Sequence, residues 1–257
     1  MPTIITCPSS LKGEVRGFKA KEANLLADRV ALKKGIAFEG ILAGCWLNTV
    51  DPGPYSWLNG GPVDWSKVLV CDRFWTMLKI RAATYGDEYS FKVQCQNGMC
   101  GETIEWELNL SDLPVKELPQ SSIDILKAGE NKFETTLDDG LKCWFKLQDG
   151  AGEMAAANIL RASQSQLIVA ALSARILEIE GVDSKKPALK RAYLENMEMR
   201  ELMRLLDIFD EADGGVSTDI DVECPKCGTV QQVSLPLGRD FFLPRAKKKS
   251  TTTATHE

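Results

Sequence analysis

Histidine is almost missing from the sequence. The 257 residues include one, His256, in the polar C-terminal segment KKKSTTTATHE. Catalysis by Ser–His or Cys–His pairs needs an imidazole held in a structured site, and so does metal-dependent hydrolysis with histidine ligands. The last residues of a chain are rarely held rigid on their own. We therefore expect the protein to belong to none of these enzyme classes.

Long hydrophobic runs are also missing. No uninterrupted stretch approaches the roughly 20 apolar residues that span a bilayer, and the first ten residues, MPTIITCPSS, lack the basic-then-apolar layout of a signal peptide. We expect no membrane partner and synthesis in a cytoplasm. In that reducing compartment the eight cysteines are not expected to form a disulfide framework, so metal binding or burial must account for them.

The sequence also has no excess of positive charge. The formal net charge is -5 at pH 7, and 44% hydrophobic with 26% charged residues is typical of a folded protein. An acidic balance does not favour a phosphate-rich partner. We interpret the lysine-rich segment at residues 245–257 as a solubilising end of the chain. Nucleic acid is therefore not the expected partner.

Helical spacing follows a strand-like first twenty residues. Apolar residues at intervals of about 3.6 predict a helix in KEANLLADRVALKKG that closes at Gly35, and another in IAFEGILAGCWLNTV with Trp46 on its apolar face. A third, in DWSKVLVCDRFWTMLKIRAATYG, is predicted to stop at Gly86. The N-terminal part of the chain is thus expected to be mostly helical.

A second helical stretch comes later in the chain. Residues 157–182 are predicted to form a helix that stops at Gly181, and residues 185–215 to form another. The latter carries a stripe of leucine, methionine and aromatic residues, which we interpret as core. An adaptable docking face is the alternative, because methionine side chains adjust to irregular partners.

Between and after these stretches the hydrophobic period changes to two. SFKVQC and TIEWELNL are predicted strands around the turn QNGMCG, with Glu105 and Glu107 on the outer face of the second strand. KFETTLDDGLKCWFKL is a second predicted hairpin with its tight turn at Gly140. There Cys143 shares its face with apolar residues, so we expect a buried small hydrophobe.

Two cysteine pairs lie at the tips of hairpins. Cys95 and Cys100 stand in FKVQCQNGMCGETIEW, and Cys224 and Cys227 stand in VECPKCGTVQQVSLPL. In each, a glycine follows the second cysteine and permits the positive φ that lets amide groups approach the sulfurs. Two such turns facing one another complete a tetrahedral shell of four sulfurs. The sequence therefore predicts one metal site.

Zinc is the expected metal, although a rubredoxin-like iron site stays open as an alternative. A shell of four thiolates leaves no free coordination position, so the ion should be structural. Four unrelated buried thiols, or a disulfide across each turn, are the competing interpretations. Cys7, Cys45 and Cys71 have no partner spacing and receive no role.

Strands flank the second pair as well. The segment alternates with period two, with Ile220 and Val222 before the pair and Val230, Val233 and Leu235 after it.

The predicted fold class is α+β, with a split zinc-ribbon-like antiparallel β region. We expect a mostly helical region at residues 1–88, the split β region at 89–150 and 211–244, a helical insertion between the two cysteine knuckles at 151–210, and a polar tail at 245–257.

One loop carries aromatic residues that suit a protein partner. In DPGPYSWLNGGPVDW, the residues Trp57, Pro62 and Trp65 are candidates for docking. Burial of these side chains against the chain's own core is the alternative. The segment is therefore a candidate interface and not an assigned one.

Several separated segments together resemble the T4-type baseplate protein family of tailed bacteriophages. They are VDPGPY, DWSKVLVCDRFWTMLKIRAATYGDEYSF, CGETIEWELNLSDLPVKELP, FETTLDDGLK, LEIEGVD, DEADGGVSTDIDVECPKCGTVQQVSLPL and DFFLP. The resemblance spans about residues 10–244. It implies a component of the baseplate in the virion of a contractile-tailed phage, or a factor that assembles the baseplate hub, and no enzymatic activity.

The resemblance also implies partners and ligands. The partners are other baseplate and tail proteins in a multi-copy assembly, and the cysteines that match the family's metal-type pairs are Cys95, Cys100, Cys224 and Cys227. The first pair departs from the pattern through its looser spacing of four intervening residues. A zinc-ribbon protein that binds nucleic acid is the remaining hypothesis, and the negative charge disfavours it.

Overall fold

The computed structural model describes most of the chain. The described residues are 2–28, 36–58, 60–162, 167–237 and 239–244. Within these ranges, no helix combines the length and the apolar character that crossing a bilayer requires.

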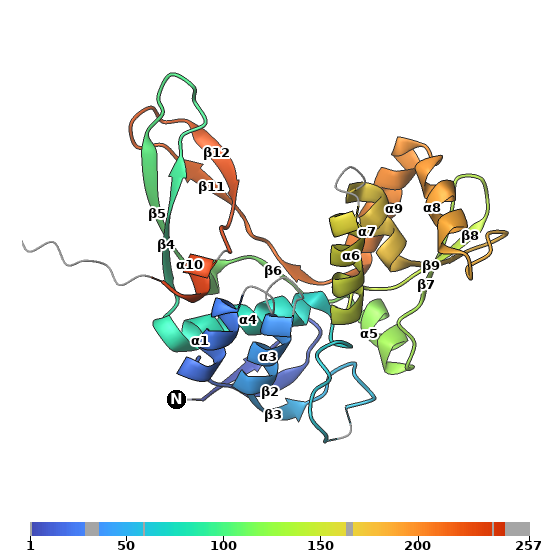
Figure 1. Ribbon diagram of the computed structural model, residues 1–257, viewed down its shortest axis with the longest axis horizontal. Coiled ribbons are helices and arrows are strands. Elements are labelled where there is room, and N and C mark those ends of the chain that lie inside the picture. Colours follow the sequence, from blue (N-terminus) through green and yellow to red (C-terminus); the bar gives the residue numbers. More distant parts are fainter. Residues whose placement is uncertain (1, 29–35, 59, 163–166, 238, 245–257) are drawn as a thin grey trace, which may run out of the picture. The chain divides into compact units, whose positions relative to one another are not determined.

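Two compact units make up the structure, and each combines two separate stretches of chain (Figure 1). The first unit holds Met1–Glu88 and Asn109–Ser217, and the second holds Tyr89–Leu108 and Thr218–Glu257. Residues 109–150, which the sequence pattern grouped with the cysteine hairpins, thus lie in the first unit. Helices and small antiparallel sheets alternate along the chain, so the predicted α+β class is confirmed.

A three-stranded antiparallel sheet opens the first unit, in the order β1-β2-β3. Its strands are β1 (Thr3–Thr6), β2 (Lys12–Val15) and β3 (Trp46–Asp51). The helices of this part of the chain are α1 (Ala20–Ala27), α3 (Ile36–Cys45) and α4 (Val70–Tyr85). As predicted, α4 stops at Gly86, whose φ of +88° a helix cannot continue through. The predicted end of the first helix at Gly35 lies outside the described residues.

Trp46 belongs to a strand, which corrects the prediction that it lies on a helix face. Helix α3 ends at Cys45, and Trp46 pairs with Val15 of β2. A Cβ at Gly13 would lie 2.0 Å from the indole ring, so only glycine leaves room for it. The indole Nε1–H donates to the Thr49 hydroxyl at 3.0 Å. Pairing with β2 therefore overrides the helical spacing.

Asp72 of α4 is fully buried and joins three parts of the first unit. Its Oδ1 accepts the backbone N–H of Ser9 at 3.0 Å, and its Oδ2 accepts the hydroxyls of Ser9 and Tyr55. The Tyr55 hydroxyl in turn accepts the backbone N–H of Leu69 at 3.1 Å. Burial raises the pKa of the carboxyl, although these hydrogen bonds oppose the shift. One polar network thus fixes the N-terminal turn against α4.

A second three-stranded sheet, in the order β7-β8-β9, forms the other part of the first unit. Its strands are β7 (Phe133–Thr136), β8 (Lys142–Phe145) and β9 (Ile176–Ile179). The predicted hairpin of β7 and β8 is confirmed, with Gly140 at φ +86° in its turn. Cys143 of β8 is completely buried, as expected, and burial raises its pKa to about 11.

Strand β9 corrects the prediction of a continuous helix across residues 157–182. After Arg175 the segment forms β9, which pairs antiparallel with β8, with Ile179 opposite Cys143. Ile176 and Ile179 are both buried. A short apolar run fits a helix or a strand equally well. Here the run forms a strand because it pairs with the edge of β8.

The remaining described helices of the first unit follow α4 in the sequence. They are α5 (Gln120–Lys127), α6 (Gly150–Ala162), α7 (Leu167–Arg175), α8 (Pro187–Glu195) and α9 (Met199–Ala212). The single helix predicted over residues 185–215 is two helices, because Glu198 has extended backbone. Short elements complete the unit: the 3-10 turn Leu110–Asp112 and the paired strands β6 (Val115–Lys116) and β10 (Gly215–Val216).

In its described residues, the second unit contains two hairpins and one short helix. The elements are β4 (Glu88–Gln94), β5 (Thr103–Asn109), β11 (Asp219–Glu223), β12 (Val230–Ser234) and α10 (Arg239–Phe242). The predicted alternation of β5 is confirmed, since Ile104 is buried while Glu105 and Glu107 are exposed. Tyr89 donates its hydroxyl to the carbonyl of Pro236 at 2.8 Å.

Candidate metal centre

The first cysteine pair is shaped by the turn between β4 and β5. The backbone N–H of Cys95 donates to the carbonyl of Glu102 at 2.8 Å and closes the hairpin. Inside the turn, the carbonyl of Asn97 accepts the N–H groups of Cys100 at 2.9 Å and of Gly101 at 3.3 Å. Gly101 has a φ of +59°. The chain therefore turns back on itself with both thiols at one end of the hairpin.

The second pair repeats this arrangement between β11 and β12. The N–H of Cys224 donates to the carbonyl of Thr229 at 2.9 Å, and the N–H of Gly228 donates back to the carbonyl of Cys224 at 2.9 Å. Gly228 has a φ of +70°, and a Cβ there would meet no atom within 4 Å. Glycine is needed for its backbone conformation and not for space.

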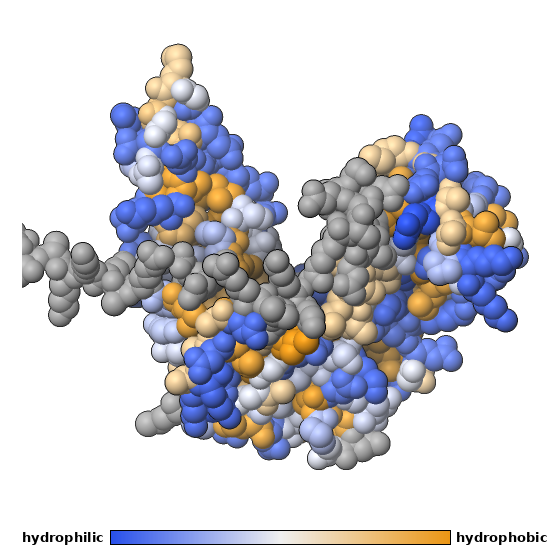
Figure 2. Space-filling view, in the orientation of Figure 1, coloured by the Kyte–Doolittle hydropathy of each residue, from blue (hydrophilic) through white to orange (hydrophobic). Residues whose placement is uncertain are grey.

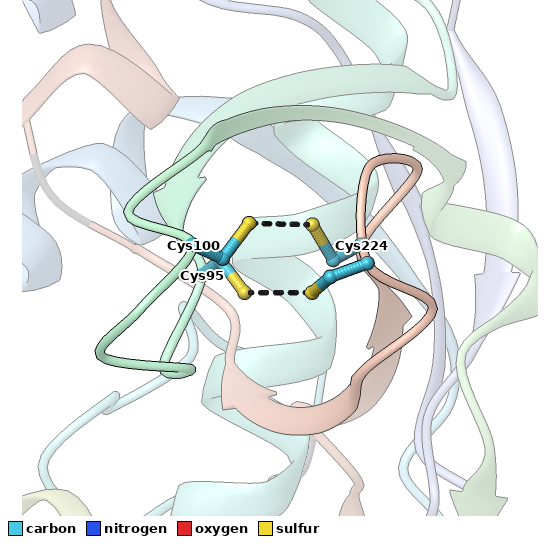
Figure 3. Close-up of side chains that lie close together, drawn as sticks. Cys95, Cys100 and Cys224 are labelled. Atoms are coloured by element: carbon cyan, nitrogen blue, oxygen red, sulfur yellow. Dashed lines mark hydrogen bonds between the residues drawn. The ribbon is translucent and has the colours of Figure 1, made fainter.

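The four sulfurs form one cluster (Figure 3). Cys95 Sγ lies 3.7 Å from Cys227 Sγ, and Cys100 Sγ lies 3.8 Å from Cys224 Sγ. All four sulfurs lie within 4.8 Å of one another. A disulfide would need about 2.05 Å, and all four cysteines are free. The two predicted pairs thus meet at one point.

These distances match a tetrahedral thiolate shell. Zinc–sulfur bonds of about 2.3 Å place the sulfurs of a tetrahedron about 3.8 Å apart. The two short Sγ–Sγ distances, 3.7 and 3.8 Å, are of that size. The donor set consists only of thiols, which soft or borderline metal ions prefer. The cluster could therefore hold a metal ion.

A small apolar core packs against the thiols. Cys95, Ile104, Val222 and Cys224 are buried together, and partly buried side chains pack against them: Val93, Cys100, Trp106, Ile220 and Val233. Cys227 is exposed. The cluster therefore lies between an apolar layer and the surface of the second unit.

Gln231 fastens the second hairpin to the first. Its side chain is buried, and its Oε1 accepts the N–H of Gln96 at 2.7 Å while its Nε2 donates to the carbonyl of Gln94 at 2.9 Å. These two residues flank Cys95. The side-chain amide of Gln231 thus bonds the backbone on both sides of Cys95, which fixes the position of Cys95 relative to β12.

Sequence reasoning missed Gln231, because it counted Val230 among the apolar residues of the strand alternation. The structure corrects this: Val230 is 61% exposed, whereas Gln231 is 4% exposed. Residues two apart on a strand share a face, so Leu235 and Val233 place position 231 on the inner face as well. The strand period could therefore have identified Gln231. The interpretation failed because an amide is not expected on an apolar face unless it is hydrogen-bonded.

The thiols differ in acidity. The Thr229 hydroxyl, 3.3 Å from Cys227 Sγ, together with the Thr229 backbone lowers the pKa of Cys227 to about 6. The backbone of Asn97 acts to lower the pKa of Cys95, but burial and hydrogen bonds with the neighbouring thiols raise it to about 12. Cys227 therefore ionises more readily than Cys95, and metal binding would release the protons of the thiols that are still protonated.

An ion pair links the two turns on the surface. Lys226 Nζ lies 3.2 Å from a carboxylate oxygen of Glu102. The Glu102 carboxylate raises the pKa of Lys226, and the thiols of Cys100 and Cys224 add to the shift. A positive charge beside the cluster partly offsets the negative charge that four thiolates would carry.

The three candidate docking residues have different surroundings. Trp65 is 4% exposed, and its ring meets that of Trp46 edge to face at 5.3 Å between centroids. Trp57 is 36% exposed, with its ring 5.6 Å from Tyr55. Pro62 is exposed and, like Trp65, lines a cavity of about 330 Å³. Trp57 and Pro62 thus stay candidates for docking, whereas the Trp65 ring is part of the core.

The sequence matches one family model. That model, described as T4 bacteriophage base plate protein, matches residues 59–243. The matched range is well over half of the chain and includes all four clustered cysteines. No curated protein and no solved structure matches the chain.

Proposed function

The chain belongs to the T4 bacteriophage base plate protein family, and from this we propose that it is a structural subunit of the baseplate of a contractile-tailed bacteriophage. In this role it binds neighbouring baseplate and tail proteins in a multi-copy assembly within the virion. The family match over residues 59–243 is the observation that carries the proposal.

A single zinc ion stabilises the subunit in this proposal. Cys95, Cys100, Cys224 and Cys227 would hold the ion, supported by their Sγ–Sγ distances and their all-thiol donor set. Four protein ligands leave no coordination position for a substrate, which favours a structural role over a catalytic one. Iron is the alternative ion, and elemental analysis distinguishes the two.

The ion would connect parts of the chain that are far apart in sequence. Cys100 and Cys224 are 124 residues apart, and Cys95 and Cys227 are 132 residues apart. Structural zinc contributes on the order of 10 kcal/mol of apparent folding free energy. The second unit has a small apolar core, so such a contribution would be a large part of its stability.

Mass spectrometry of purified, intact phage particles tests the proposed role. We expect peptides of this chain in every preparation, at a fixed ratio to other baseplate proteins. A chain that is required for tail formation but absent from finished particles would instead be a transient factor for assembly of the baseplate hub. Salt-dependent binding to DNA or RNA would indicate the third hypothesis, a nucleic-acid-binding protein.

A further inference from the structure

The first unit contains a surface groove beside helix α8, with a volume of about 830 Å³. The turn between β7 and β8 forms one side of it, and α8 with the start of α9 forms another. The segment that follows β9 closes the rim. We call this feature the α8 groove; none of the cysteines or the candidate docking residues lines it.

Apolar side chains from α8 and the residues after it line the α8 groove, and we call them its floor. Leu189, Tyr193 and Met197 line it from α8 and the residues that follow. Leu189 is 48% exposed, and at the start of α9 Met199 and Met203 are 57% and 47% exposed. Leu189, Tyr193 and Met197 belong to the stripe that the sequence left open as core or docking face, whereas Met199 and Met203 lie outside the groove lining. Apolar and hydrophilic residues lie side by side on the surface over α8 and α9 (Figure 2).

Carboxylates surround this floor. Asp138 and Asp139 come from the β7–β8 turn, Asp183 from the segment after β9, and Glu198 and Glu201 from the start of α9. No lysine or arginine is among the described residues that line the groove. Glu201 is buried, whereas the other four carboxylates are exposed, so the exposed part of the lining carries negative charge.

Part of the negative charge is already paired. Arg204 contacts Glu201 at 2.7 Å and Asp138 at 3.3 Å. Lys186 lies 3.6 Å from a carboxylate oxygen of Asp183. The charge of Arg200 also acts on Asp138. These three cations do not match the five carboxylates of the lining, so the groove keeps an excess of negative charge.

The Tyr193 hydroxyl donates to Asp139 Oδ2 at 2.6 Å, and this hydrogen bond lowers the pKa of Asp139. Asp139 is therefore ionised at neutral pH, and its position at the groove is fixed by α8. A fixed carboxylate is a defined partner for a cation.

We propose that the α8 groove binds a basic amphipathic segment of a neighbouring baseplate protein. The apolar side chains of such a segment would lie on Leu189 and Met197, while its lysine or arginine side chains would meet the carboxylates of the rim. Long cationic side chains suit this arrangement because their stems are apolar and their ends are charged. Methionine adapts to the shape of its partner.

Two other occupants fit the charges less well. A second copy of the chain that used the same groove would bring two acidic rims together, which costs free energy through like-charge repulsion. The chain's own basic segment, residues 245–257, carries lysines but no large apolar residue to cover the floor. A partner with both cationic and apolar side chains is therefore favoured.

The proposal rests on the proposed function, because it names the kind of partner that a baseplate subunit would bind through this groove. The two can fail separately. Mass spectrometry of particles tests incorporation into the tail, whereas the experiment below tests the groove on the isolated full-length chain.

A fluorescent model peptide provides the test. The probe is a helical peptide of about 14 residues, four turns long, with leucine on one face and lysine on the other. Two matched peptides replace every lysine by glutamate or every leucine by serine. We expect saturable binding of the leucine–lysine peptide by fluorescence anisotropy, and at least about tenfold weaker binding of both matched peptides, a change of about 1.4 kcal/mol.

Variants of the chain locate the binding site. The double variant Asp183→Lys, Glu198→Lys and the single variant Leu189→Ser should each weaken binding at least about tenfold. Glu117→Lys, an exposed charge reversal that does not line the groove, should leave it unchanged. Circular dichroism checks the fold, and Glu198→Gln, at an exposed position, replaces any variant that unfolds.

Three results would overturn the proposal. One is a peptide that does not bind. Another is equal weakening by Glu117→Lys and by the groove variants, which would indicate nonspecific attraction to an acidic protein. The third is a dimer in sedimentation velocity that Leu189→Ser abolishes, since the groove would then belong to a contact between two copies of the chain.

Discussion

The sulfur atoms of Cys100 and Cys224 lie 3.8 Å apart, although 124 residues separate them in the sequence. The hairpins that carry them come from opposite ends of the inserted first-unit segment Asn109–Ser217. The geometry brings two turns of the same design together, each with a positive-φ glycine directly after its second cysteine. Stability of this cluster and stability of the second unit are therefore expected to be coupled.

Replacing Cys224 by serine should abolish the proposed zinc binding. Three thiols and a hydroxyl bind zinc far more weakly than four thiolates, because the soft ligand is lost. We expect about one zinc per chain in the wild type and close to none in Cys224→Ser by elemental analysis. The free energy of unfolding of the second unit should fall by several kcal/mol.

Cys143→Ala is the matched control for this change. Cys143 is completely buried in the second sheet of the first unit and does not belong to the cluster. Its replacement should leave the zinc content unchanged. Equal metal content in the wild type and Cys224→Ser would contradict the metal site.

Gln231→Leu should weaken metal binding without removing a ligand. The substitution leaves the N–H of Gln96 and the carbonyl of Gln94 without their side-chain partner, so the position of Cys95 is less well fixed. Loss of such supporting hydrogen bonds typically lowers metal affinity about 10- to 100-fold. Competition with a chromogenic chelator measures the affinity.

The neighbouring exposed residue gives a control for that experiment. Gln232 lies on the opposite, exposed face of β12, and Gln232→Leu should keep the affinity of the wild type. If both variants released zinc to the chelator equally, the amide of Gln231 would have no part in positioning the cysteines.

Glu22 is expected to make the first unit sensitive to acid. Burial alone would raise the pKa of this carboxyl, but Arg16 at 2.8 Å and the backbone N–H of Lys19 at 2.8 Å hold it at about 2. A pKa lowered from 4.5 to about 2 corresponds to about 3 kcal/mol of stability. That stability is present above pH 4.5 and is lost as the pH falls toward 2.

Urea unfolding of Glu22→Gln tests this pH dependence. At pH 7 the variant should be less stable than the wild type by about 2 kcal/mol, because an amide loses the charged interaction with Arg16. The difference should shrink between pH 4.5 and pH 3. Glu117→Gln, at an exposed position, should follow the wild type throughout. A constant difference at every pH would refute the role of the ionised carboxylate.

Parts of the fold could be predicted because local chemistry determines them. The hairpin around Gly140 and the end of α4 at Gly86 follow from glycine's access to positive φ. The buried position of Cys143 follows from strand alternation. Trp46 and Ile176 were assigned to helices and lie in strands, because pairing with β2 and β8 overrides their local spacing.

By itself, the sequence determined the α+β class, the two cysteine turns and the family, because each depends on residue types at short, fixed spacings. Only the tertiary structure decided that Gln231, and not Val230, supports the cysteines, and that the α8 groove combines carboxylates from three separate segments. Such features depend on which distant segments pack together. Packing energy is summed over the whole chain, and no local pattern records it.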